Sequence, residues 1–282
     1  MVWPAMVALT LVAPGETIAG SVGTTGAGRL ENGFKLPLEG TWHEFAGPVR
    51  SRGTNYATIE LAALIARAAS TVAGAVPGAP LVLADASADG GGELARHASH
   101  ESGRDVDLLF YVRDARGESV ASPGFRSFDG AGRCTSERCA LRLDVPRTWW
   151  LVRTLLASQR PAVQYLFVSE PVRALLLAHA RARGEHAAIM RRAERVLHQP
   201  SDSSAHDDHF HLRVYCGPAD RAAGCVDTGP RWSWVGDDGR AAPIPGRRGS
   251  ASTRARTGRA GSDSERHPSR HPATSEPNAQ RP

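Results

Sequence analysis

The sequence predicts an α+β domain followed by a disordered tail. Of the 282 residues, 41% are hydrophobic, which is enough to build the core of one sizeable domain. Segments with strand and helix patterns follow one another without the regular strand–helix alternation of a doubly wound α/β fold. After Trp234 both kinds of pattern stop.

The expected elements follow from the spacing of apolar residues. Residues 13–55 are rich in Gly, Thr and Pro, and we expect irregular structure with short strands there. Apolar residues at helical spacing predict helices, whereas short apolar runs and strict alternation predict strands. The predicted helices span residues 55–72, 145–159 and 187–197, with another opening at Pro171, and the predicted strands span residues 80–84, 105–112, 162–169 and 208–215.

The chain is expected to have three parts. Residues 1–20 form an apolar, signal-like N-terminus that lacks the preceding Lys or Arg of a typical signal peptide. Residues 21–234 form the folded domain. Residues 235–282 form a basic tail with too few large apolar residues to offset the chain entropy lost on folding. The interior has no uncharged apolar run of about 18 residues, so no membrane-spanning helix is expected.

The net charge of +5 lies mostly in the tail. Residues 236–282 contain nine Arg against five Asp or Glu, which leaves the body of the chain close to neutral. A nucleic-acid-binding domain concentrates positive charge on a folded face. We therefore expect no nucleic-acid partner, and a metal-dependent nuclease or phosphodiesterase is disfavoured.

Four cysteines fall into two local pairs, Cys134 with Cys139 and Cys216 with Cys225. Neither pair has the two-residue gap of a zinc knuckle. Two local disulfides formed in an oxidising compartment explain the pairs better than four free thiols. The protein is therefore expected to be periplasmic or secreted.

Histidine and aspartate gather in two short stretches, residues 97–107 (HASHESGRDVD) and residues 206–211 (HDDHFH). Together they hold five of the eleven histidines. His209 and His211 are two apart on a predicted strand, so both project from the same face, while Phe210 and Leu212 face the core. This strand therefore offers its polar side to a cleft.

The first stretch repeats this alternation. Asp105 and Asp107 share one face of their predicted strand. His100 precedes Gly103, and glycine permits the positive φ that a reversal of the chain over the Asp107 strand often needs. We therefore expect His100 to fold back toward Asp107.

Zinc in a hydrolytic site takes three protein ligands and leaves one position open. His100, Asp107 and His211 supply two imidazoles and one carboxylate, which suit this ion. Zinc held there would lower the pKa of a bound water to about 7 and so provide a nucleophile. His206 and His209 would remain near that water, one as general base and one as stabiliser of the oxyanion.

Two further points stay open at the level of sequence. The same three ligands would also accept Mn, Co or Ni. Asp207 and Asp208 either orient the imidazoles through hydrogen bonds or belong to a turn of the loop.

The two histidine stretches together resemble the penicillin-insensitive murein endopeptidases. The resemblance rests on residues 97–108 (HASHESGRDVDL) and residues 206–216 (HDDHFHLRVYC), and the pair is far more specific than a lone histidine motif. It extends over roughly residues 20–230, with the GSVGTTGAGRLENGFKLP region and the YLFV strand followed by a helix. The wider group includes lysostaphin-type endopeptidases and D-Ala-D-Ala carboxypeptidases.

This resemblance implies an α+β fold built around a small antiparallel β-sheet flanked by helices. It implies zinc-dependent hydrolysis of D-alanyl–diaminopimelate cross-links in peptidoglycan, insensitive to β-lactams because there is no catalytic serine. Peptidoglycan is then the expected partner. The site residues it implies are His100, Asp107 and His211 as zinc ligands, His206 and His209 as catalytic residues, and His97 as a ligand of a second metal.

The chain departs from the family pattern in several places. Further ligands for a second metal between Asp107 and Trp149 are not matched, and Asp129 and Asp144 are no more than possibilities. One zinc ion is therefore expected, with a second metal near His97 left open. The pair Cys216 and Cys225 resembles a family disulfide. The pair Cys134 and Cys139 and the basic tail have no counterpart in the family pattern.

Two other functions compete with the endopeptidase. One is a zinc D,D-carboxypeptidase or dipeptidase that trims uncross-linked stem peptides. The other is a non-catalytic module that binds the cell wall, which the retention of five clustered histidines and Asp107 argues against. The oligomeric state is left open by the sequence.

Overall fold

The computed structural model of the chain describes residues 20–201 and 203–245. The predicted signal-like segment, apart from residue 20, lies outside the described residues. Residues 246–282 of the predicted tail lie outside them as well.

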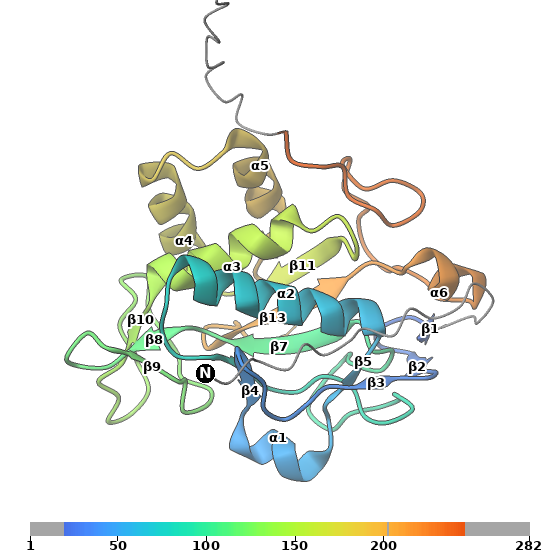
Figure 1. Ribbon diagram of the computed structural model, residues 1–282, viewed down its shortest axis with the longest axis horizontal. Helices are drawn as coiled ribbons and strands as arrows, with labels where there is room; N and C mark the ends of the chain where they lie inside the picture. Colours follow the sequence, from blue (N-terminus) through green and yellow to red (C-terminus); the bar gives the residue numbers. More distant parts are fainter. Residues whose placement is uncertain (1–19, 202, 246–282) are drawn as a thin grey trace, which may run out of the picture. The chain divides into compact units, whose positions relative to one another are not determined.

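A six-stranded β-sheet forms the centre of the domain (Figure 1). The antiparallel strands β11, β13, β7 and β6 lie at its centre, and each edge adds one parallel strand. In spatial order the strands are β12 (Leu197–His198), β11 (Val163–Phe167), β13 (His209–Val214), β7 (Asp105–Leu109), β6 (Leu81–Leu83) and β4 (His43–Phe45).

The expected small antiparallel sheet is therefore only partly correct. The fold is α+β and its central strands are antiparallel, but the sheet is larger and mixed. A parallel pair needs a crossover connection, usually helical. Helices α4 and α5 connect β11 to β12, and the segment containing α1 and α2 connects β4 to β6.

The predicted helices are confirmed with shifted ends. The second helix begins four residues later than expected because Thr58 caps it: its Oγ1 accepts the N–H of Leu61 at 3.3 Å, and the preceding Tyr56–Ala57 form a short strand. No described helix has both the length and the apolar character to cross a bilayer. The helices are α1 (Gly47–Arg52), α2 (Ile59–Ala75), α3 (Val145–Ala157), α4 (Glu170–Ala182), α5 (Ala187–Val196) and α6 (Pro218–Ala222).

Short strands outside the central sheet pair locally, as expected for the N-terminal region. The predicted strand 105–112 ends at Leu109, and its last residue belongs to a separate small sheet. The local pairs are β1 (Ser21–Gly23) with β2 (Gly28–Leu30), β3 (Phe34–Lys35) with β5 (Tyr56–Ala57), and β8 (Val112–Arg113) with both β9 (Ser119–Val120) and β10 (Arg142–Leu143).

The core lies between the central sheet and helices α2 and α3, which Figure 1 shows on the viewer's side of β7 and β13. Val106 and Leu108 of β7, and Phe210 and Leu212 of β13, are at most 1% exposed. Fully burying an apolar side chain of this size contributes about 1.5–3 kcal/mol. Because strand residues alternate, the side chains between them must face away from this core.

Arg104 ties the ends of the domain together. Its guanidinium is buried and donates to Ser21 Oγ at 3.0 Å, Val214 O at 3.1 Å, Val226 O at 3.1 Å and Asp227 Oδ1 at 3.0 Å. The N-terminal strand β1, the end of β13 and the segment after the second disulfide are thus held at one point. Both predicted disulfides, Cys134–Cys139 and Cys216–Cys225, are present.

The packed region extends beyond the predicted boundary at Trp234. Val235 and Ala241 form a β-bridge and are 7% and 3% exposed. Arg192 of α5 donates a hydrogen bond to the carbonyl of Ala242. These contacts are made by small residues and by the backbone, which is why composition alone did not reveal them.

Candidate metal centre

The side of the sheet opposite the core carries the predicted site. β7 and β13 pair Asp107 with His211, and β13 and β11 pair His211 with Phe167. Residues that are directly opposite in a sheet share a face. A cleft of about 710 Å³ opens over this face, and Asp107, His209 and His211 are among the residues that line it.

The loop before β7 returns His100 to the sheet. His100 and Gly103 both have positive φ, 73° and 74°, so the reversal predicted at Gly103 is confirmed. A non-glycine residue in this region is strained and must be held by its surroundings. Here the His100 N–H donates to Asp105 Oδ2 at 3.1 Å, and its carbonyl accepts the hydroxyl of Ser87.

The structure brings the three expected ligands together around one oxygen. His100 Nε2 lies 3.4 Å from Asp107 Oδ1, and His211 Nδ1 lies 3.5 Å from the same atom. The two imidazole centroids are 4.6 Å apart. All three side chains are buried, at 0%, 1% and 7% exposure for His100, Asp107 and His211.

Each ring has an acceptor oxygen on the side away from Asp107, and this acceptor favours a proton on the nitrogen that faces it. His100 Nδ1 lies 3.2 Å from the carbonyl of Ala86, which can only accept, so Nδ1 carries the proton. His211 Nε2 lies 3.4 Å from Asp105 Oδ1, an ion-pair contact that lacks the geometry of a hydrogen bond. His100 Nε2 and His211 Nδ1 are thus the nitrogens directed at the shared oxygen, and each can bind a metal ion when its ring is neutral.

The donor atoms fit a cation. His100 Nε2 and Asp107 Oδ1 are buried and have no hydrogen-bond partner among the described residues. Leaving a buried polar atom without a partner costs about 1–3 kcal/mol, and more when the group is charged. Two imidazoles and a carboxylate suit Zn²⁺, and also Mn, Co or Ni.

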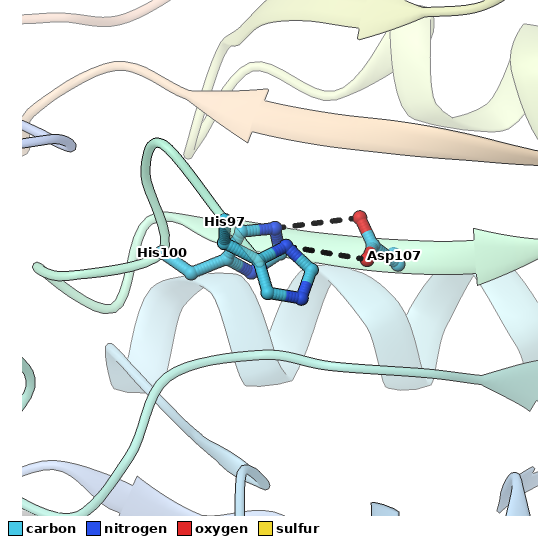
Figure 2. Close-up of side chains that lie close together, drawn as sticks. All are labelled: His97, His100 and Asp107. Carbon is cyan, nitrogen blue, oxygen red and sulfur yellow. Dashed lines mark ion pairs between the residues drawn. The ribbon is translucent and has the colours of Figure 1, made fainter. Parts of the chain in front are cut away.

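His97 approaches the other oxygen of the same carboxylate. Figure 2 shows His97 and His100 reaching from one loop toward Asp107 on β7. One ligand atom from each of these three residues lies within 4.8 Å of the others. His97 Nδ1 is 4.0 Å from Asp107 Oδ2, and its Nε2 is 3.3 Å from Asp85 Oδ2. Among the described residues this is the group with the spacing of a metal site, and it shares His100 and Asp107 with the expected zinc ligands.

Asp85, just after β6, supports His97. It forms an ion pair with Arg52 at 2.7 Å and accepts the hydroxyl of Thr54. Burial would raise its pKa, but the hydrogen bonds from His97, Arg52 and Thr54 outweigh burial and lower the pKa to about 2. Asp85 is therefore an anion that holds His97 in place.

His206 and His209 lie at the mouth of the site. His209 Nε2 is 3.5 Å from Asp107 Oδ1, and its ring centroid is 4.9 Å from that of His206. His206 Nδ1 donates to the carbonyl of Ser204 at 2.7 Å, and its φ of 54° is another strained backbone position. Both expected catalytic histidines are thus beside the three expected ligands.

Of the two neighbouring aspartates, Asp208 is the one that contacts a histidine. Its Oδ1 lies 2.5 Å from His209 Nδ1. Asp207 instead contributes its backbone carbonyl, which accepts the N–H of Phe128 at 2.9 Å. The contact predicted with an imidazole is thus found for Asp208 and not for Asp207.

The carboxylates dominate the electrostatics of the expected ligands. Burial would raise the pKa of Asp107, but His100 and His209 outweigh it and hold the pKa well below its usual range. Burial would lower the pKa of His100, but Asp107 outweighs it and raises the pKa. For His211 burial prevails, and its pKa falls to about 4, which keeps the imidazole neutral and able to bind a cation.

The two outer histidines differ in protonation. Burial would lower the pKa of His209, but the adjoining Asp107 and Asp208 outweigh it and raise the pKa to about 10. Burial, helped by the nearby His209, lowers the pKa of His206. In the absence of a cation, His209 is therefore the proton donor of the pair and His206 the neutral member.

The architecture and this constellation agree with a comparison of the whole chain. The sequence model of a family described as penicillin-insensitive murein endopeptidase matches residues 21–239. The chain belongs to this family. A Haemophilus influenzae protein described as a penicillin-insensitive murein endopeptidase is 32% identical over 157 residues, which are 53% of this chain and 48% of that protein. The chain thus matches about half the length of this relative.

Two residues considered as second-metal ligands in this member of the murein endopeptidase family have structural roles instead. Asp129 Oδ1 accepts the N–H groups of Ala131 and Arg133 within a turn. Asp144 caps α3 by accepting the N–H of Arg147 and pairs with Arg113. Neither Asp129 nor Asp144 lines the cleft.

Three residues around the expected ligands were given no role by the sequence, although Asp105 was placed on the face of Asp107. Asp105 contacts the backbone of His100 and the ring of His211, and its alternation with Asp107 was an available signal. Asp85 gave no signal, because it stands alone after a short strand. Arg213 continues the alternation of His209 and His211 and lies on the same face.

Proposed function

We propose that this protein is a zinc-dependent endopeptidase that hydrolyses D-alanyl–diaminopimelate cross-links in bacterial peptidoglycan. The observation that carries the proposal is the convergence of His100, Asp107 and His211 on one buried carboxylate oxygen at the floor of a cleft. Membership of the murein endopeptidase family supports the substrate class.

In this proposal His100 Nε2, Asp107 Oδ1 and His211 Nδ1 hold the zinc ion. Bound zinc supplies Lewis acidity that activates a water at neutral pH. Asp105 Oδ1, 3.4 Å from Nε2 of His211, favours a proton on that nitrogen, which leaves Nδ1 for the ion. His97 is the candidate ligand for a second metal, on the Oδ2 side of Asp107.

His209 and His206 divide the acid–base work. Asp208 holds His209 by Nδ1, which leaves Nε2 directed toward the metal-binding carboxylate. The carbonyl of Ser204 holds His206 in the same way. One histidine accepts a proton from the attacking water, and the other donates a hydrogen bond to the developing oxyanion.

The proposed compartment is periplasmic or extracellular, where peptidoglycan is the substrate. Two disulfides fit an oxidising compartment, and the part of the chain described here has no free cysteine. The cleft is open enough to admit a peptide, at about 710 Å³.

The decisive experiment is digestion of purified, labelled sacculi followed by muropeptide profiling. The zinc-loaded protein should convert dimeric muropeptides into monomers. A chelator should abolish the conversion, and added zinc should restore it. The His211→Ala variant serves as the matched protein without the proposed ligand.

Other outcomes would favour the competing functions. Release of free D-alanine without loss of dimers would indicate a D,D-carboxypeptidase. Binding to sacculi without any chelator-sensitive hydrolysis would indicate a wall-binding module.

A further inference from the structure

A second pair of polar side chains, Tyr165 and Arg213, lies beside the metal-site residues. Strands β11 and β13 pair Tyr165 with Arg213, and the next pair on the same face is Phe167 with His211. Successive residues on one face of a strand are about 7 Å apart. Both side chains line the cleft, so a ligand that reaches His211 also reaches them.

Arg213 is held so that part of its guanidinium stays available. Nε donates to Asp105 Oδ1 at 2.8 Å, and Nη2 donates to Asp105 Oδ2 at 3.3 Å. No hydrogen bond joins Nη1 to another described residue, and the side chain is 13% exposed. The guanidinium carbon also lies 5.5 Å from the centroid of the Phe167 ring. The charge is therefore oriented before any ligand arrives.

Tyr165 presents its hydroxyl at the same place. Its ring stacks on Phe167, with centroids 4.6 Å apart and planes 21° apart, and meets Trp232 edge-on at 6.0 Å. The hydroxyl makes no hydrogen bond to another described residue. Gly229 lies beside it, and a Cβ there would be 3.2 Å from Oη. A rigid aromatic ring thus directs an unpaired donor into the cleft.

We propose that Tyr165 and Arg213 form a carboxylate-binding subsite that reads the residue on the leaving-group side of the scissile amide. A guanidinium and a phenol are donors at neutral pH and match the two oxygens of a carboxylate. Asp105 balances the charge of Arg213, so the subsite favours a carboxylate by the direction of its donors and not by net charge.

This inference rests on the proposed function and sharpens its substrate. In the proposed cross-link, a free carboxylate sits on the same carbon as the amide nitrogen that is released. Such a carboxylate lies close to the scissile bond. The Tyr165–Arg213 pair is correspondingly close to His211, since it is adjacent to the Phe167–His211 pair on the same face of the sheet. An uncharged carboxamide at that carbon would lose the charge-assisted hydrogen bonds.

The test uses two cross-linked peptide dimers that differ only at this carbon, one with the free carboxylate and one with the carboxamide. Charge-assisted hydrogen bonds are roughly twice as strong as neutral ones, so the wild-type kcat/KM should be at least about tenfold higher for the free acid. Tyr165→Phe should lower kcat/KM for the free acid about fivefold or more and leave the amide substrate nearly unchanged.

The control for the loss of a hydroxyl is Tyr56→Phe, which lies on β5 away from the cleft and should change neither rate. Arg213→Lys should remove most of the preference, and its zinc content shows whether the ligand set is intact. Equal kcat/KM of the wild type for both dimers would overturn the inference, as would equal losses on both substrates in Tyr165→Phe.

A binding measurement separates this inference from the proposed function. The His209→Ala protein should bind the free-acid dimer about tenfold more tightly than the amide. That preference, found together with no hydrolysis by the zinc-loaded wild type, would support the subsite and refute the peptidase. Equal affinities would refute the subsite whatever the activity.

Discussion

Replacing Asp105 by Asn tests whether the residues behind the ligands determine metal affinity. Asp105 is fully buried and contacts Arg213 Nε at 2.8 Å, the His100 N–H at 3.1 Å and His211 Nε2 at 3.4 Å. Asn retains one acceptor oxygen but loses the charge. Partners of this kind alter metal affinity by about 10–100-fold, which corresponds to about 1.4–2.8 kcal/mol.

The same change also removes one half of a buried ion pair. Breaking such a pair costs about 3–5 kcal/mol when the remaining charge is sealed from water. Arg213 reaches the cleft, since its side chain is 13% exposed. We therefore expect the free energy of unfolding to fall by about 3 kcal/mol or less, below the range for a sealed pair.

The assay is competition for zinc against a chromophoric chelator, with thermal unfolding measured on the same samples. Asp89→Asn is the matched control, because it removes an exposed carboxylate that does not line the cleft. Zinc affinity of Asp105→Asn within about twofold of the wild type would contradict the 10–100-fold expectation. So would an equal loss in Asp89→Asn.

Two further predictions concern the neighbouring aspartates and the end of the domain. Asp208→Asn should lower kcat about tenfold or more with zinc retained, because Asp208 orients His209. Asp207→Asn should have little effect on kcat, since only the backbone of Asp207 makes a contact near the site. Equal losses of kcat in the two variants would refute the distinction. A chain ending at Trp234 should be about 3 kcal/mol less stable than one ending at Pro245, since it loses the buried Val235 and the hydrogen bond to the backbone of residue 242. Calorimetry should show a Tm lower by about 6–12 °C, and coincident unfolding of the two chains would contradict the packing described above.

The alternation of polar and apolar residues made much of the site predictable. His209 with His211, and Asp105 with Asp107, each had to share a strand face, and the structure places them so. The positive φ at Gly103 was also predictable, because the chain must reverse there to bring His100 over the strand that carries Asp107.

Other features depend on contacts between distant segments. His211 lies directly opposite Asp107 because of the register in which β13 pairs with β7. The spacing of residues within each strand does not reveal this register. Asp85 joins the site only because β6 lies beside β7. The edge strands β4 and β12 are three and two residues long, too short to show a periodicity.

Zinc content, measured on the wild type, His211→Ala and His209→Ala after identical purification and zinc loading, tests the central claim most directly. The wild type should retain about one zinc ion per chain after removal of excess metal, as a hydrolytic site with three protein ligands does. His211→Ala should lose the ion and all chelator-sensitive hydrolysis of sacculi, whereas His209→Ala should keep the ion and lose hydrolysis. A His211→Ala protein that still binds zinc tightly, or a His209→Ala protein that no longer does, would contradict the assignment of His100, Asp107 and His211 as the metal ligands.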